Sequence, residues 1–163
     1  MTNREIERKF LVIDDSFRAH AHTHYDIIQG YISRENGRSI RIRLRTAADG
    51  TQQAYLTIKS RLESFTRFEW EKQISVEDFR ALLPLCGAHV IDKTRYILPA
   101  ESLSDDNAHP LSLKWEIDEF RMPNPGLVMA EIELPNEQTS FVRPSFIGEE
   151  VTYDSRYYNA NMV

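Results

Sequence analysis

Apolar and polar residues alternate with a period of two along most of the chain. In SIRIRLR, Ile40, Ile42 and Leu44 alternate with three arginines. Successive side chains of a β-strand point to opposite faces, so this period is typical of strands. It predicts eight of them: Glu5 to Val12, Tyr25 to Arg34, Ser39 to Thr46, Ala54 to Ser60, Phe68 to Ser75, Thr94 to Leu98, Leu111 to Phe120 and Val128 to Leu134.

Short connections between strands, such as AADG at 47–50, suit antiparallel neighbours, and ENGR at 35–38 has the Asn-Gly signal of a tight hairpin. SVEDFRALLPLCG predicts one helix, with Ser75 as its cap and Gly87 as its stop. A shorter helix is expected from Asp15 to His20, and a helix or turn in GEEVTYDSRYYNANM. The fold class is therefore α+β, dominated by antiparallel sheet.

The polar faces of the predicted strands are sorted by the sign of their charge. Basic residues share faces at Arg41, Arg43 and Arg45, at Lys59, and at Lys93 and Arg95, whereas acidic pairs occur at Glu5 and Glu7, Glu69 and Glu71, Glu116 and Asp118, and Glu131 and Glu133. Like charges two residues apart on one face repel each other, so each row requires opposite charges, metals or ligands nearby.

Two interpretations of this sorting compete. The charges either form a solvated outer face with weak cross-strand ion pairs, or they line the interior of a closed barrel. Their recurrence on most strands favours an eight-stranded antiparallel barrel with a charged interior, flanked by a few helices. Carboxylate clusters without cysteine pairs select Mg²⁺ or Mn²⁺, and rows of Arg and Lys bind phosphate oxygens. Together they predict a polyphosphate site.

The composition of the whole chain narrows the class of protein further. A length of 163 residues fits a single domain over 1–163, and a net charge of −5 argues against a dedicated nucleic-acid binder. The single cysteine, Cys86, cannot form an internal disulfide, and no apolar run near 20 residues or secretory segment is present. A cytoplasmic protein without membrane contact is expected, and a homodimer is left open.

The residues EIERK at 5–9 resemble the E-x-E-x-K signature of CYTH domains, the triphosphate tunnel metalloenzyme family. That signature alone is weak because Glu and Lys are common. The later stretches SIRIRLR, LTIKS, FEWEKQI, KTRY, WEIDEF, AEIEL and EEVTYDSRYYN follow in the family's order and span nearly the whole chain. The resemblance implies an eight-stranded antiparallel tunnel with inward-pointing charges, in agreement with the alternation.

The resemblance also implies roles for the charged residues. Glu5, Glu7, Glu131 and Glu133 would bind metal, as two Mg²⁺ or Mn²⁺ ions. The phosphates would be bound by Lys9, Arg41, Arg43, Lys59, Lys93 and Arg95. These basic side chains would be oriented by Glu69, Glu71, Glu116 and Asp118. Catalysis would depend chiefly on Glu133, Lys9, Arg41 and Arg43.

The activity that the resemblance implies is hydrolysis of the terminal phosphoanhydride of inorganic tripolyphosphate, and to some extent of nucleoside triphosphates, by a metal-activated water. A class IV adenylate cyclase is an alternative, but such cyclases tend to carry a His-Phe element well before E-x-E-x-K, and only four residues precede Glu5. A thiamine triphosphatase is a further alternative, but it would require an aromatic clamp for the thiamine, and no residue is assigned to one. A non-catalytic polyphosphate-binding module would be favoured by loss of a metal carboxylate, and none is missing.

One position departs from the family pattern. Many members carry a basic residue just before the C-terminal Asn, where this chain has Tyr158. Arg156 or Tyr31 is expected to take over part of that contact, which places Arg156 among the candidate substrate-binding residues.

Other conspicuous residues are interpreted as structural. His20, His22 and His24 alternate in AHAHTHYD, and near a surface strand or turn this is more often incidental than a metal site. Trp70 and Trp115 alternate away from the acidic residues and are expected to pack in the core or against a helix. Tyr96 is expected to pack on the outside.

Overall fold

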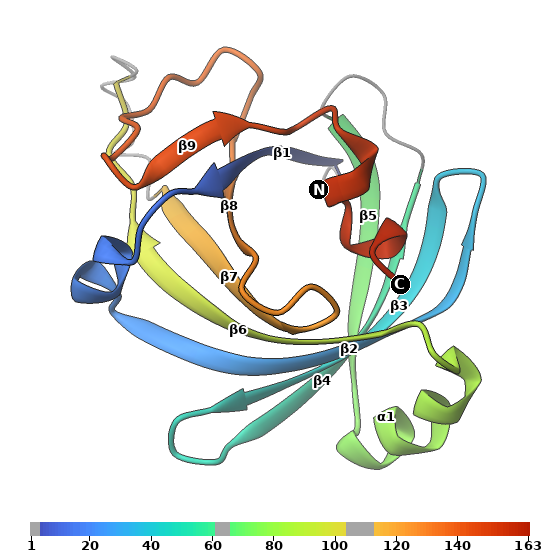
Figure 1. Cartoon of the computed structure of the whole chain (residues 1–163). Helices are drawn as coiled ribbons and strands as arrows, with labels where there is room; N and C mark the ends of the chain where they lie inside the picture. The colour runs from blue at the N-terminus through green and yellow to red at the C-terminus, as the bar shows by residue number, and fades with distance from the viewer. Residues whose placement is uncertain (1–3, 61–65, 104–112) are drawn as a thin grey trace.

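The computed structural model describes residues 4–60, 66–103 and 113–163. Its strands are β1 (Arg4–Val12), β2 (Thr23–Glu35), β3 (Arg38–Ala47), β4 (Gln52–Lys59), β5 (Thr66–Ile74), β6 (Val90–Pro99), β7 (Lys114–Met122), β8 (Val128–Glu133) and β9 (Ile147–Glu150). The described residues also form one α-helix, α1 (Val76–Leu82). Four 3-10 turns are present as well: η1 (Ser16–His20), η2 (Leu83–Cys86), η3 (Ser155–Tyr157) and η4 (Asn159–Asn161). The predicted α+β class is confirmed (Figure 1).

Eight of the described strands close into an antiparallel barrel in the order β5-β4-β3-β2-β6-β7-β8-β1. The circle is completed where 4–6 of β1 pair with 66–68 of β5, and Figure 1 shows β1 crossing the top of the ring to meet β5. Beyond this contact, the same edge of β1 pairs with β9. The predicted eight-stranded barrel is therefore confirmed, and β9 is a ninth strand that the alternation did not predict.

The strand boundaries follow the pairing of neighbours. The β2–β3 hairpin turns at Asn36 and Gly37, whose φ angles of 53° and 74° are those of the type I′ turn that Asn-Gly favours. β6 begins at Val90 rather than Thr94, because it pairs with β2 as far as Gly30. β7 begins at Lys114, and the predicted start at 111–112 lies outside the described residues. No helix in the described part of the chain has the length and apolar character needed to cross a membrane.

The predicted helix after β5 is present but shorter. The Ser75 hydroxyl accepts a 2.9 Å hydrogen bond from the Asp78 backbone N–H and caps α1, as expected. Pro84 lacks a backbone N–H, so the chain continues as the 3-10 turn η2 instead of an α-helix. The shorter helix predicted near Asp15 to His20 is likewise a 3-10 turn, η1.

The turn η2 and helix α1 cover the outer face of neighbouring strands. Phe79 and Cys86 are buried against Ile42 of β3 and Ala54 of β4. The Cys86 side chain packs so closely on β2 that a Cβ at Gly30 would lie 2.5 Å from its sulfur, so only glycine fits there. The single cysteine therefore serves in packing outside the barrel.

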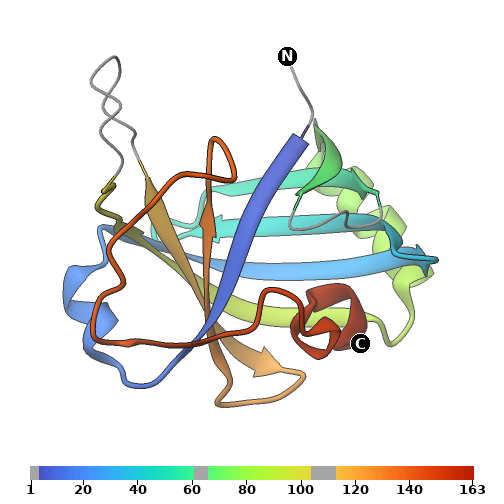
Figure 2. The same ribbon diagram turned by 90° about the horizontal axis from the view of Figure 1, so that it is seen from above.

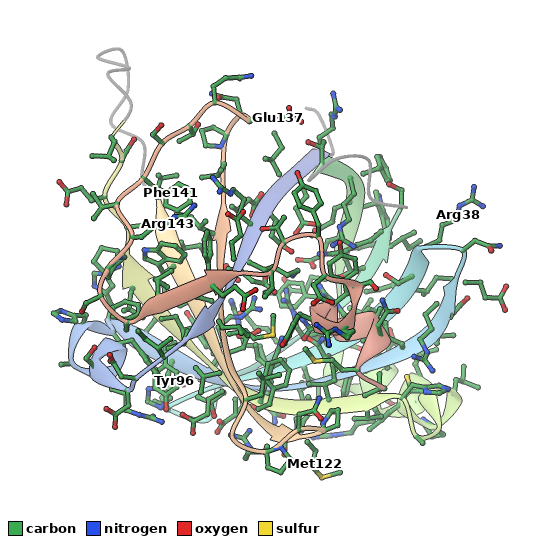
Figure 3. The ribbon with its side chains drawn as sticks, turned by 45° about the horizontal axis from the view of Figure 1, so that its top comes forward. Arg38, Tyr96, Met122, Glu137, Phe141 and Arg143 are labelled. Carbon is green, nitrogen blue, oxygen red and sulfur yellow. The ribbon has the colours of Figure 1, made fainter. Side chains whose placement is uncertain are left out.

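A second apolar cluster covers the outside of β1, β7 and β8. Trp115 is fully buried there, with its ring 5.6 Å from Phe10 and 5.5 Å from Phe141 in edge-on contacts. Phe141 is labelled in Figure 3. The prediction of outward core packing is thus confirmed for Trp115. It is wrong for Trp70, which faces outward but remains 37% exposed, because α1 lies over β3 and β4 instead.

The C-terminal segment, residues 151–163, folds back onto the barrel. Its predicted helix or turn takes the form of η3 and η4, which Figure 2 shows alongside the strands. Val151 is buried in a cluster with Tyr31, Ile91, Phe120 and Met129, and Tyr157, Ala160, Met162 and Val163 pack against it. Apolar contacts therefore hold the segment near the interior of the barrel.

Candidate functional site

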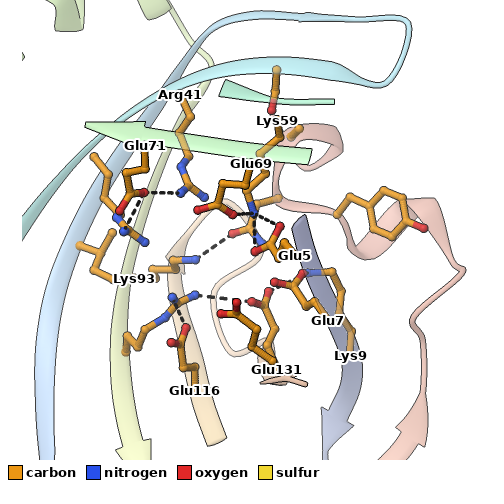
Figure 4. Close-up of a pocket in the computed structure, with 18 of the residues that line it drawn as sticks. Glu5, Glu7, Lys9, Arg41, Lys59, Glu69, Glu71, Lys93, Glu116 and Glu131 are labelled. Carbon is orange, nitrogen blue, oxygen red and sulfur yellow. Dashed lines mark hydrogen bonds and ion pairs between the residues drawn. The ribbon is translucent and has the colours of Figure 1, made fainter. Parts of the chain in front are cut away.

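A cavity of about 420 Å³ lies inside the barrel and is lined mostly by polar side chains (Figure 4). Its charged lining consists of Lys9, Arg34, Arg38, Arg41, Arg43, Arg45, Lys59, Arg67, Lys93, Arg95 and Lys114, together with Glu5, Glu7, Glu69, Glu71, Glu116, Glu131 and Glu133. Eleven basic against seven acidic side chains give the cavity an excess of positive charge within a chain of net charge −5. Such an interior attracts anions.

The adjacent strands β1 and β8 carry the acidic side of the cavity. Glu7 pairs in register with Glu133, and Lys9 with Glu131. The Lys9 ammonium lies between two carboxylates, 2.6 Å from Glu7 Oε1 and 2.7 Å from Glu131 Oε1. Burial alone would lower the pKa of Lys9, but Glu131 and Glu7 raise it above its ordinary value. Lys9 is therefore firmly charged.

Glu133 lies at the rim of the cavity, in a crowded acidic environment. Burial raises its pKa to about 7, and the negative charges of Glu5, Glu69, Glu116 and Glu7 act in the same direction. The described residues offer it no ion pair. A cation bound near Glu133 would offset these negative charges.

The basic side of the cavity is formed first by β3. Arg41 and Arg43 share one acidic partner, with Nη2 atoms 3.8 and 3.5 Å from Glu71 Oε2. The buried Nε atoms of both arginines have no hydrogen-bond acceptor among the described residues. Burial, together with the positive charges of the nearby Arg41 and Arg95, lowers the pKa of Arg43 to about 10. These guanidinium groups have donors left for an anionic ligand.

Lys59 of β4 connects the basic and acidic sides. Its ammonium lies 2.9 Å from Glu5 Oε2 and 3.3 Å from Glu69 Oε2. Although burial disfavours the charged form, Glu5 and Glu7 raise the pKa of Lys59. Three predicted site residues, Glu5, Lys59 and Glu69, are thus brought together from three different strands (Figure 4).

The strands β6 and β7 hold a second ion-pair group. Arg95 binds the Asp118 carboxylate with two hydrogen bonds of 2.7 and 2.8 Å and also pairs with Glu116. Lys93 donates a 2.6 Å bond to Asp118 Oδ2. Burial lowers the pKa of Lys93 to about 8, although Asp118 opposes this shift. The geometry of Asp118 agrees with the predicted orienting role.

One predicted residue does not join this group. The side chain of Arg156 is 80% exposed and pairs with Asp154, and it does not line the cavity. The expectation that Arg156 replaces the basic residue missing at position 158 is therefore not met, because η3 turns its side chain outward to a neighbouring carboxylate two residues away. Tyr31, the other residue expected to help, does line the cavity.

The basic group beside Tyr158 is Arg67, which the sequence analysis missed. Its guanidinium lies 5.8 Å from the centre of the Tyr158 ring, and its Nε lies 3.6 Å from Glu5 Oε2. Tyr158 donates a 3.0 Å hydrogen bond to the Thr152 carbonyl. Arg67 lies two residues before Glu69 in TRFEWE and therefore on the same strand face, so extending the predicted strand to Thr66 would have revealed it.

The remaining conspicuous residues lie elsewhere. His20, His22 and His24 are exposed, and the described residues contain no cluster of His, Cys, Asp or Glu already converging on one point. Tyr96 lies against η1, with its ring 5.3 Å from Phe17, as the predicted outer packing requires (Figure 3).

Two inorganic triphosphatases resemble this chain over nearly its full length. An inorganic triphosphatase of Acetivibrio thermocellus is 38% identical, over 98% of this chain and 93% of that protein. An inorganic triphosphatase of Nitrosomonas europaea is 35% identical, over 95% of this chain and 93% of that protein.

Solved structures with the same fold include a crystal structure of an inorganic triphosphatase. It is 33% identical and has a TM-score of 0.59, over 96% of this chain and 92% of that chain. A putative adenylate cyclase from Bacillus halodurans has a TM-score of 0.54 but only 15% identity, over 83% of this chain and 84% of that chain. The second likeness shows the fold alone. Since the CYTH domain model matches residues 3–160, the chain belongs to the CYTH domain family.

Proposed function

We propose that this protein hydrolyses the terminal phosphoanhydride of inorganic tripolyphosphate, with a weaker activity on nucleoside triphosphates. The observation that carries the proposal is the cavity, in which a basic wall with unpaired arginine donors faces a group of carboxylates. Relatives named inorganic triphosphatase, at 38% and 35% identity, support the same choice.

The family is metal-dependent, and the residues of the cavity fit a hard divalent cation. Glu5, Glu7, Glu131 and Glu133 supply only oxygen donors, and burial together with the surrounding carboxylates raises the pKa of Glu133. We assign these four residues to two Mg²⁺ or Mn²⁺ ions. A bound cation would supply neutralisation of charge on the phosphoryl oxygens.

The basic residues perform the other half of the chemistry in this proposal. Arg41, Arg43, Lys59 and Arg95 come from three strands, and their spacing within one cavity suits a short chain of phosphates. They neutralise charge that builds up during transfer and hold the scissile bond in line with an attacking water. Cys86 is buried on the outside, against β2, so a cysteine nucleophile is not part of the mechanism.

The test measures phosphate release from tripolyphosphate, ATP, thiamine triphosphate and pyrophosphate with Mg²⁺ or Mn²⁺, and cyclic AMP formation from ATP in parallel. Fastest release from tripolyphosphate is expected. Cyclic AMP as the main product from ATP would indicate a cyclase, and tight binding of tripolyphosphate without turnover would indicate a binding module.

Cytoplasmic location and a homodimer stay predictions. Cell fractionation tests the location, and light scattering tests the oligomeric state.

A further inference from the structure

Asn159 of the C-terminal segment reaches into the cavity and contacts Lys93. Its Oδ1 atom accepts a 2.9 Å hydrogen bond from the Lys93 ammonium and a 3.3 Å bond from Gln29 Nε2. Gln29 is itself fully buried and donates to the Tyr31 hydroxyl at 3.2 Å. Because two donors face the same atom, the carboxamide of Asn159 is oriented with its oxygen toward Lys93.

Lys93 is placed by two acceptors of different charge. Its side chain is 1% exposed, and its ammonium donates to the carboxylate of Asp118 and to the neutral amide of Asn159. An ammonium group has three donors, so one remains for a ligand in the cavity that Lys93 lines. The two acceptors therefore fix the direction of the third donor.

The Asn159 side chain is uncharged, which matters for the ammonium group that it contacts. Lys93 already faces the carboxylates of Asp118 and Glu131 and the guanidinium of Arg95. A second carboxylate in direct contact would add a negative charge that offsets the ammonium and repels a phosphate, whereas an amide oxygen holds the ammonium without adding charge. Resting on the proposed function, we propose that Asn159 is a positioning residue, which aims the Lys93 ammonium at a phosphate oxygen without placing a further negative charge beside it.

The packing of the C-terminal segment supports this role. Ala160, next in the chain, packs against the apolar cluster around Val151 and accepts a 2.9 Å hydrogen bond from Arg34 Nη1 through its backbone carbonyl. Asn159 is thus held through the packing of Ala160 on one side and presents its amide to Lys93 on the other. Accurate placement of a group that binds substrate requires such support.

The test compares Asn159→Ala and Asn159→Asp, first by kinetics with tripolyphosphate and Mg²⁺. Asn159→Ala removes the acceptor, so kcat/KM should fall about tenfold to hundredfold. The isosteric Asn159→Asp keeps the acceptor but adds a negative charge, so KM should rise about tenfold while kcat changes less. Asn136→Ala and Asn136→Asp are matched controls, because Asn136 caps a surface turn outside the cavity through a 3.0 Å bond from the Gln138 N–H.

The second measurement follows the Lys93 side chain by NMR titration with ¹³C-labelled lysine, without substrate. The two variants should shift its pKa in opposite directions, downward in Asn159→Ala and upward in Asn159→Asp, which a purely structural role would not produce. Unchanged titration, or kinetics equal to the Asn136 controls, would overturn the positioning role. If the wild type released no phosphate from tripolyphosphate, the proposed function would fail and the titration alone would decide.

Discussion

Lys9 of β1 donates a 2.7 Å hydrogen bond to Glu131 of β8, and the two residues are direct partners in the strand register. The pair joins a residue proposed to bind phosphate to one proposed to bind metal. Lys9 also holds Glu7, at 2.6 Å, and all three side chains are largely buried. The same ammonium therefore links the stability of the barrel to the charge balance of its interior.

Replacing Lys9 by Met should destabilise the fold by about 3 kcal/mol or more, because two buried carboxylates lose their counter-charge. Urea unfolding at pH 7.5 without metal measures this loss. Addition of Mn²⁺ should recover more stability in Lys9→Met than in the wild type, since a cation can then neutralise Glu7 and Glu131. Lys72→Met, at an exposed position of β5, is the matched control. Equal unfolding free energies for the two variants would contradict the prediction.

Glu133→Gln should be more stable than the wild type at pH 8 in the absence of metal. In the presence of metal, the variant should lose most of its turnover. The raised pKa of about 7 means that ionised Glu133 destabilises the fold. The loss of stability grows as the pH rises from about 4.5 to 7, and it is absent below pH 4.5. Because Glu133 is partly exposed, the loss amounts to about 1 kcal/mol. Urea unfolding between pH 4 and 8 measures the gain in stability, and phosphate release measures the loss of turnover. An unchanged rate would remove Glu133 from the proposed metal site.

The alternation of charge predicted the barrel and its interior because both follow from one local rule. In β3, Arg41 and Arg43 had to share a face opposite Ile42, and the structure places that face inward. β9 escaped the rule because IGEE is only four residues long and has no alternating pattern. Its pairing with β1 also contains a register irregularity between Phe10 and Val12, which has no local sequence signal.

The contacts around the C-terminal segment could not be predicted for a different reason. The bond between Lys93 and Asn159 joins residues 66 positions apart and depends on how apolar residues pack the segment against the barrel. The sequence likewise offered Arg156 as the cation to accompany Tyr158. Only the closure of β5 onto β1 brings Arg67 there, while Arg156 turns to Asp154.

The value of kcat/KM for tripolyphosphate should fall as pH rises through about 8, because Lys93 then loses its positive charge. Burial lowers this pKa from its ordinary value, so the group is protonated below pH 8 and neutral above it. In Lys93→Arg the side chain does not titrate in this range, and the fall should move beyond pH 9. Profiles from pH 6.5 to 10 test this, with Lys72→Arg as the control. Retention of the fall at pH 8 in Lys93→Arg would assign it to another group.

Arg67→Ala should raise KM for tripolyphosphate about tenfold, since it removes the cation that stands beside Tyr158 in the cavity. Tyr158→Lys should restore part of this loss in the Arg67→Ala background, because it places a positive charge at the same end of the cavity. Arg156→Ala should change KM less than twofold, as its guanidinium is exposed and bound to Asp154. Steady-state kinetics of the three variants at one Mg²⁺ concentration separate these effects. A larger effect from Arg156→Ala than from Arg67→Ala would return the basic contact to Arg156.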